Sequence, residues 1–169
     1  MSLIVEKAQE LILACKSKKT AVDATCGNGH DTLFLLEHFS EVFAFDIQPL
    51  AIKRTKAKTE GYRNLHLYKE DFRKINQYLK GADAIMFNLG FLPGSDKKIK
   101  TSANESAEAI ISAFQILNEG GIMTVACYTE HEGGRDEFLK IKAALESLQI
   151  PFKMYEGFAN NEVLIEIRK

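Results

Sequence analysis

The chain has 169 residues, of which 46% are hydrophobic and 27% are charged, and its formal net charge is −1. We expect one domain over residues 1–169, because this length and composition suit a single full-sized core. The near-zero net charge excludes attraction to nucleic acid or membrane by bulk charge, and no apolar run approaches the roughly 20 residues of a membrane span. Three widely separated cysteines indicate neither a disulfide framework nor a metal site, so we expect a cytoplasmic protein without a metal.

Apolar runs alternate with helical patterns along the chain. Residues 1–19 have the pattern of an amphipathic helix and lack the features of a signal peptide. Five largely continuous apolar runs then predict buried strands at residues 20–24, 41–46, 64–68, 82–88 and 121–128. Helical patterns lie between and after them, at residues 31–38, 49–60, 72–79, 102–117 and 135–148.

The last third of the chain adds two helix signals and a hairpin. Ser102 followed by Glu105 fits a capping box, and the Gly120-Gly121 pair is expected to stop the helix that begins there. Two final strands, at residues 152–158 and 163–168, are expected to be joined by a turn at residues 160–161. The pattern predicts an α/β fold, a Rossmann-like doubly wound sheet of seven mostly parallel strands with an antiparallel last strand.

A glycine turn, Gly27-Asn28-Gly29, follows the first predicted strand, where open α/β sheets bind ligands. Gly27 can take a positive φ, and Gly29 allows a ligand to approach the backbone closely. A dinucleotide fingerprint needs a third glycine at the position of Thr32. Asp23, at the end of the strand, is also better suited to a cationic group than to a pyrophosphate. We therefore predict S-adenosylmethionine (SAM), which carries a sulfonium and an ammonium and no phosphate, in preference to NAD.

Acidic residues also follow the second and third predicted strands. Asp46 is placed to accept both ribose hydroxyls, a role that an NAD site would share. Asp71 is placed to accept from an adenine amino group, and Phe72 to stack on the adenine ring. Each acid has an alternative role in capping a turn or a helix. Together, at the ends of three successive strands, they favour a nucleoside site.

The fourth predicted strand ends in Asn88, which is followed by Leu89, Gly90 and Phe91. Amino-group methyltransferases often carry an Asp/Asn-Pro-Pro-aromatic tetrad here, whose polar side chain orients the target nitrogen. This chain keeps the polar and aromatic ends of that tetrad and lacks its prolines. The alternative is a rigid loop, turned by Gly90 and the glycine and proline after it, in which Asn88 caps local backbone.

Two further groups lie near this predicted edge. Tyr128, Glu130 and His131 follow the fifth strand, where His131 either accepts a proton, contacts the substrate or is an exposed loop histidine. Lys97 and Lys98 follow the Asn88 loop and are placed to contact phosphate. The basic residues of the second predicted helix after the glycine turn, at positions 53–58, are read as a solvated face.

Three motifs carry a resemblance to a known family: DATCGNGHDT at residues 23–32, NLGFLPG at residues 88–94 and YTEHEGG at residues 128–134. With them the chain resembles the rRNA methylase family of class I SAM-dependent methyltransferases, which is associated with MnmM-like tRNA 5-aminomethyl-2-thiouridine methyltransferases. The resemblance implies methyl transfer from SAM, with S-adenosylhomocysteine (SAH) as product, to the amine of 5-aminomethyl-(2-thio)uridine at the tRNA wobble position.

The resemblance and the strand ends together assign candidate roles. The cofactor would contact Asp23, Gly27, Asn28, Gly29, Asp31, Asp46, Gln48, Asp71, Phe72 and Asn88. The acceptor would face Asn88, Tyr128 and His131 as catalytic residues, with Leu89, Gly90, Phe91, Lys97 and Lys98 as binding residues. Other acceptors, a small amine metabolite or rRNA, stay open, as do a non-catalytic SAM-binding protein and a homodimer. An NAD(P) oxidoreductase is disfavoured by Thr32 and Asp23.

Overall fold

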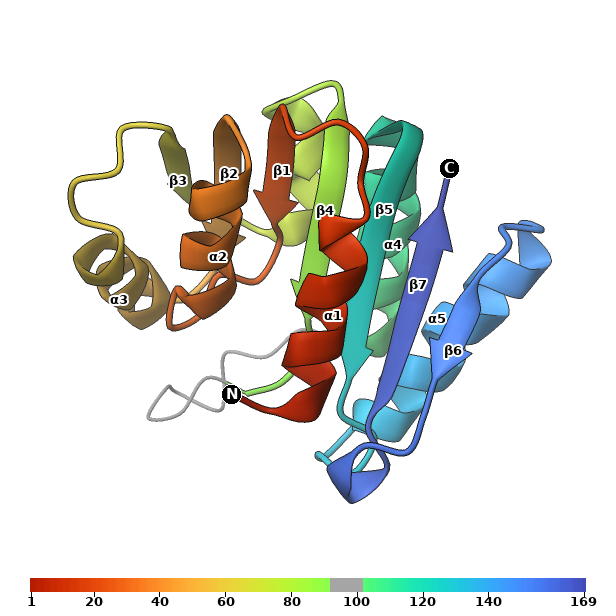
Figure 1. Cartoon of the computed structure of the whole chain (residues 1–169). Coiled ribbons are helices and arrows are strands. Elements are labelled where there is room, and N and C mark those ends of the chain that lie inside the picture. The colour runs from red at the N-terminus through yellow and green to blue at the C-terminus, as the bar shows by residue number, and fades with distance from the viewer. Residues whose placement is uncertain (92–101) are drawn as a thin grey trace.

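The computed structural model describes residues 1–91 and 102–169, and its strands form one sheet in the order β3-β2-β1-β4-β5-β7-β6 (Figure 1). The first five strands pair in parallel, whereas β7 is antiparallel to both β5 and β6. This arrangement confirms the predicted seven-stranded, mostly parallel sheet with an antiparallel last strand. The strands are β1 (Thr20–Asp23), β2 (Glu41–Asp46), β3 (Leu65–Lys69), β4 (Ala82–Asn88), β5 (Leu117–Cys127), β6 (Lys153–Tyr155) and β7 (Val163–Arg168).

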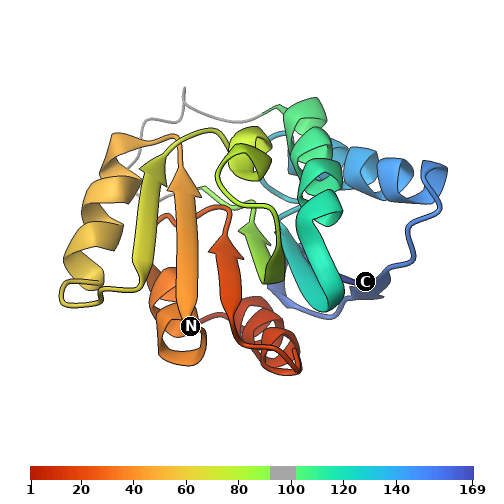
Figure 2. The same cartoon turned by 90° about the horizontal axis from the view of Figure 1, so that it is seen from above.

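Helices cover both faces of this sheet, as Figures 1 and 2 show: α1, α2 and α3 lie on one face, and α4 and α5 on the other. Strands covered on both faces are expected to be continuously apolar, and six successive residues of β4, from Ala82 to Phe87, are buried. The helices are α1 (Leu3–Leu13), α2 (His30–His38), α3 (Pro49–Lys58), α4 (Ala103–Ile116) and α5 (Gly134–Ser147), with short 3₁₀ turns η1 (Phe72–Gln77) and η2 (Ala159–Asn161).

Two hydrophobic clusters fix the helices to the sheet. On one face, Ile4 and Ile12 of α1 pack with Leu35 of α2 against the sheet. On the other face, Ile110 of α4 and Ile141 of α5 belong to a larger cluster with the opposite side chains of the strands. All five side chains are fully buried, and burial of each contributes about 1.5–3 kcal/mol. The strand ends, and the loops that follow them, are thereby held in place.

The junction between α4 and β5 differs from the prediction. The capping box is confirmed: the backbone N–H of Glu105 donates to the Ser102 hydroxyl (3.3 Å), and the backbone N–H of Ser102 donates to the Glu105 carboxylate (3.2 Å). However, α4 ends at Ile116, and the Gly120-Gly121 pair lies inside β5. A register irregularity opposite residues 82–84 accommodates this early start of the strand.

Several other elements are shorter than predicted, among them α1, which ends at Leu13 although the helical pattern extended to residue 19. Residues 72–77 form a 3₁₀ turn instead of an α-helix, and β6 covers Lys153–Tyr155 instead of residues 152–158. β6 is an edge strand that pairs with β7 alone, and residues 156–158 lead from it into η2. Within the described residues, no helix combines the length and the apolar character needed to cross a membrane.

The sheet brings the ends of its parallel strands to one edge. Asp23, Asp46 and Asn88 are the last residues of β1, β2 and β4. Because β7 runs antiparallel to β5, its first residue, Val163, pairs with the last residue of β5, Cys127. The segment that precedes β7 therefore joins the loops after the parallel strands.

Candidate functional site

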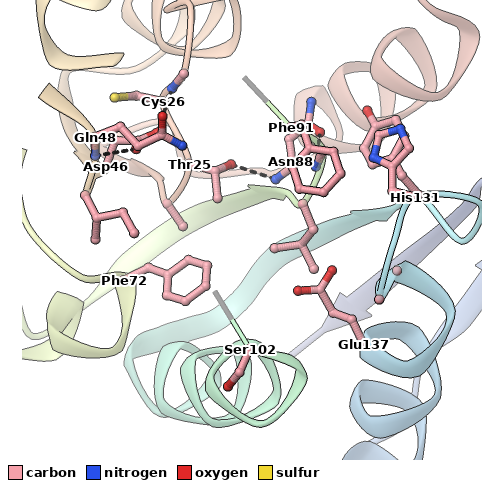
Figure 3. A pocket seen from close by; sticks show the side chains of 18 of the residues that line it. Thr25, Cys26, Asp46, Gln48, Phe72, Asn88, Phe91, Ser102, His131 and Glu137 are labelled. Carbon is pink, nitrogen blue, oxygen red and sulfur yellow. Dashed lines mark hydrogen bonds between the residues drawn. The ribbon is translucent and has the colours of Figure 1, made fainter. Parts of the chain in front are cut away.

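A cavity of about 550 Å³ lies along this edge of the sheet. Figure 3 shows Asp46 and Gln48 on one side of it and His131 on the other, with Asn88 and Phe91 between them. Most of the residues singled out from the sequence are brought together on its wall, and their contacts with a ligand stay predictions. These are Gly27, Asn28, Asp31, Asp46, Gln48, Asp71, Phe72, Asn88, Leu89, Gly90, Phe91, Tyr128 and His131.

Asp23 is not on this wall, and its expected place has to be corrected. Its carboxylate is buried and accepts hydrogen bonds from the Thr32 hydroxyl (2.6 Å) and the Thr25 backbone N–H (3.2 Å). Burial and the nearby charge of Asp31 raise the pKa of Asp23. Both of its oxygens thus accept hydrogen bonds from the two ends of the glycine turn, as the capping alternative expects. Lys97 and Lys98 lie outside the described residues.

Gly29 also differs from its expected place beside a ligand. It is the N-cap of α2 with a φ of +83°, and a Cβ there would lie 3.0 Å from the Cα of Thr55 in α3. The close approach that Gly29 permits is therefore between two parts of the protein backbone. Gly27 has the predicted positive φ, 52°, and lies on the cavity wall.

Asp46 connects the glycine turn to the loop after β2. Its carboxylate accepts from the backbone N–H of Gly27 (3.1 Å) and from that of Gln48 (3.0 Å). Burial raises the pKa of Asp46, and these backbone hydrogen bonds oppose the shift. Each carboxylate oxygen can accept a second hydrogen bond, so the side chain can still receive ribose hydroxyls from the cavity.

Asp31 lies on the wall in the first turn of α2 and is held by a residue of α1. The Gln9 side chain donates to its carboxylate (2.9 Å). Burial raises the pKa of Asp31, and the hydrogen bond from Gln9 opposes the shift. The N-terminal helix therefore contributes to the site, although the sequence patterns assign none of its residues there.

Asp71 and Phe72 follow β3. Asp71 caps η1 through the Arg73 backbone N–H (2.8 Å) and is paired with the Arg73 guanidinium (2.8 Å), whose hydrogen bonds lower the pKa of Asp71. The Phe72 ring is buried against Phe87, with 5.7 Å between the ring centroids, and it lines the cavity. Phe72 is thus placed as expected for an adenine contact, whereas any contact of Asp71 with adenine would be shared with Arg73.

Asn88 is held on several sides at the end of β4. Its backbone N–H donates to the Thr25 hydroxyl (2.7 Å), and its side-chain oxygen accepts from the Gly90 N–H (3.4 Å). The Tyr128 ring lies beside it across Gly90, and burial raises the pKa of Tyr128 to about 12. The amide is therefore fixed at the centre of the cavity beside a phenol that stays protonated at neutral pH.

Three aromatic rings form the wall beyond Asn88. The imidazole of His131 stacks on Phe91 (ring centroids 5.0 Å apart) and on Tyr128 (5.3 Å), with interplanar angles of 15° and 12°. Gly90 packs against this group, because a Cβ at its position would lie 3.1 Å from the Tyr128 ring. The prediction that the Asn88 loop and the loop after β5 share one edge is therefore met by direct ring contacts.

Several residues on the cavity wall were not singled out as site residues from the sequence, among them Thr25, Glu137 and Glu162. Thr25 holds Asn88, as described above. Glu137 of α5 accepts a 2.5 Å hydrogen bond from Ser106 of α4, and burial raises its pKa. Glu162 precedes β7. Glu162 could have been predicted from the antiparallel hairpin, because an antiparallel last strand begins at the edge where the parallel strands end.

Comparison with known proteins gives the family. The model described as "Putative rRNA methylase" matches residues 42–162 of this chain. A curated relative from Arabidopsis thaliana, named "tRNA (mnm(5)s(2)U34)-methyltransferase, chloroplastic", is 34% identical over 141 residues, which are 73% of this chain and 52% of that protein. The chain thus spans about half the length of this relative.

Two solved structures share the whole fold. The "putative rRNA-methylase" from Clostridium thermocellum is 31% identical with a TM-score of 0.86, over 100% of this chain and 98% of that chain. A "putative methyltransferase" from Streptococcus mutans, solved in complex with SAH, is 26% identical with a TM-score of 0.86, over 99% of this chain and 98% of that chain. The fold and the matched residues, which include the second and third motifs, confirm the resemblance, and the chain belongs to the rRNA methylase family of class I SAM-dependent methyltransferases.

Proposed function

We propose that the protein methylates the primary amine of 5-aminomethyl-(2-thio)uridine at the wobble position of tRNA. The observation that carries the proposal is the fixed amide of Asn88, between the loops assigned to the cofactor and a wall of aromatic rings. The name of the Arabidopsis relative, a tRNA methyltransferase acting on the same class of nucleoside, supports this choice of acceptor.

The residues on the cofactor side suit SAM, which supplies an electrophilic methyl group. Asp46 has the free lone pairs to accept ribose hydroxyls, and Phe72 offers a buried ring for the adenine. Asp31, whose carboxylate is oriented by Gln9, is placed to bind the ammonium of the methionine part. These residues suit SAM by their chemistry, because carboxylates and an aromatic ring can bind a cationic nucleoside that has no phosphate.

The acceptor side aligns a nitrogen lone pair. The Asn88 side-chain oxygen accepts a hydrogen bond from the amine N–H, which directs the lone pair towards the methyl carbon. Positioning of this kind, with exclusion of water, supplies much of the rate of a direct transfer. Asn88 cannot remove a proton from an alkylammonium, whereas an imidazole nitrogen of His131, which lies on the same wall, can accept one.

Basic residues of α3 are placed to contact the tRNA backbone. The Arg54 guanidinium donates to the Asn28 side chain (3.0 Å), and the Lys58 ammonium lies 3.0 Å from the His30 ring. Asn28 and His30 both line the cavity, so these cations stand at its margin. We propose that they contact phosphate, which revises the reading of this helix as a merely solvated face.

The test is conversion of tRNA that carries 5-aminomethyl-2-thiouridine. Purified protein, SAM and such tRNA are incubated, and the nucleosides are separated and identified by mass spectrometry. We expect conversion to the methylaminomethyl nucleoside, and no conversion of tRNA with an unmodified wobble uridine. Methylation of small amines or rRNA without any conversion of the tRNA would overturn the proposal in favour of those acceptors.

A further inference from the structure

A second hollow of about 260 Å³ opens beside the acceptor side of the cavity. Tyr128, His131 and Glu162 line both spaces, and Glu130 and Asn160 complete the second. The hollow is therefore an extension of the place where the acceptor amine would lie. It is enclosed by two loops, the one after β5 and the one before β7.

Hydrogen bonds tie these two loops together. The Thr129 hydroxyl donates to the backbone carbonyl of Asn161 (2.8 Å), and the Asn161 side chain donates to the Glu130 carboxylate (2.7 Å). Asn160 and Asn161 both have a φ of 53°, a left-handed conformation that asparagine tolerates better than most residues. The loop before β7 is thus held in a defined position, and the Glu130 carboxylate is used to hold it.

The Glu162 carboxylate differs from that of Glu130 in its surroundings. Glu162 is half-buried and interacts electrostatically with His131 and Tyr128. Burial raises the pKa of Glu162, and the charge of His131 opposes this. Within the part of the chain that the structure describes, no hydrogen bond or ion pair engages the Glu162 carboxylate, whereas Asn161 donates to that of Glu130, so a cation in the hollow would supply a partner for Glu162.

We infer that Glu162 is a specificity residue that binds the ammonium form of the acceptor through a charge-assisted hydrogen bond. The inference rests on the proposed function and adds to it a reason why the protein would select a cationic amine. Glu162 and His131 line the same hollow as Tyr128. Tyr128 in turn lies beside Asn88, which places the hollow next to the amide that would orient the amine. An ammonium bound there lies between its anionic partner and a base.

Methyl transfer to the bound ammonium takes place in two steps, a proton transfer and a substitution at the methyl carbon. The bound ammonium transfers one proton to a nitrogen of His131, which becomes imidazolium, and the amine keeps its lone pair. The lone pair forms the nitrogen–carbon bond while the bond between the sulfonium sulfur and the methyl carbon breaks. The sulfur thereby loses its positive charge, and SAM is converted to SAH. The product is a secondary ammonium whose positive charge again faces Glu162.

The experiment compares Glu162→Gln with the matched control Glu130→Gln, which removes the same charge from the same hollow. KM and kcat are measured with 5-aminomethyl-2-thiouridine tRNA, and SAM affinity is measured by calorimetry. For Glu162→Gln we expect KM for this tRNA to rise at least tenfold with SAM affinity unchanged. Glu130→Gln is expected to stay within about twofold, because a glutamine oxygen can still accept from Asn161.

A second readout separates recognition of charge from general damage. Binding of tRNA with an unmodified wobble uridine should be equal for wild type and Glu162→Gln, since that tRNA brings no ammonium. Glu162→Asp, which keeps the charge, should recover part of the lost KM. A Glu162→Gln protein with the KM of the wild type, or one that binds both tRNAs equally weakly, overturns the inference and leaves the proposed function standing. Failure of the wild type to convert any aminomethyl tRNA overturns both.

Discussion

Asn88 combines a rigid placement with a chemistry limited to orientation. Its backbone is held by Thr25 and its side chain by the Gly90 N–H. Replacement by alanine should lower kcat about 100-fold, because the amine loses its alignment, while SAM affinity changes less than about twofold. Kinetics with the tRNA substrate and calorimetry with SAM measure the two quantities. An equal loss of turnover and SAM affinity would show that Asn88 serves the cofactor instead.

Gly29 offers a test of backbone packing. Gly29→Ala combines a positive φ with a Cβ that meets the backbone of Thr55, so it should lower the free energy of unfolding by more than about 2 kcal/mol. Gly61→Ala is the control, because its φ is also positive (+93°) but nothing lies within 4 Å of its Cβ. Urea unfolding measures both variants. Equal losses of unfolding free energy in the two variants would mean that the contact with Thr55 adds nothing to the cost of the positive φ.

At this scale the sequence predicts which residues share the edge but not which way each one faces. Residue type and position at a strand end placed Asp46, Phe72 and Asn88 correctly on the cavity wall. Asp23 has the same position at a strand end, yet Thr25 and Thr32 take up its carboxylate. That outcome depends on the path of the glycine turn in three dimensions, which no residue pattern specifies.

Helix α4 tests capping at the scale of an element. Its capping box satisfies two backbone N–H groups that would otherwise lack helical partners. Ser102→Ala should therefore cost about 1 kcal/mol of the free energy of unfolding. Chemical denaturation measures this value, and the Glu105→Ala and double variants complete a cycle. If the two single losses simply add, the two side chains do not act as a unit.

Element boundaries were predicted best where burial is continuous. The observed bounds of β2, β4 and β7 equal those expected, because their apolar runs are flanked by clear polar or turn residues. The predicted end of α4, residue 117, is within one residue of the observed end, but the start of β5 was predicted at residue 121 instead of 117 because Gly120-Gly121 was read as a helix stop. In the structure those glycines lie in β5 between its pairs with β4, and their backbone groups form hydrogen bonds with Lys169 instead. The short β6 was overextended because an edge strand has one neighbour and its ends are weakly specified.

The charge of the whole molecule is nearly balanced, but its distribution is not. The net charge is −1, and half-buried carboxylates gather along the cavity. Burial raises the pKa values of Asp31 and Asp46 above the ordinary 3.8, so protonation begins at a higher pH than usual. A cationic ligand favours the ionised form, which means that SAM binding releases protons. Affinity for SAM should therefore weaken as the pH falls towards these raised pKa values.

Calorimetry at pH 8 and pH 5.5 tests this expectation. We expect SAM to bind several-fold more weakly at pH 5.5, and we expect SAH, which lacks the sulfonium charge, to show a smaller difference. Asp31→Asn removes one of the titrating groups and should flatten the dependence for SAM. Affinity that is constant between the two pH values would mean that these carboxylates are already ionised without ligand.

The reversed direction of β7 has a consequence for the choice of acceptor. Residues up to Phe72 surround the place assigned to SAM, whereas the turn at residues 159–162 comes from the far end of the chain and reaches only the opposite margin. Under the proposed function, we expect substitutions of Asn160 and Glu162 to alter which acceptor is methylated while the residues assigned to SAM stay unchanged.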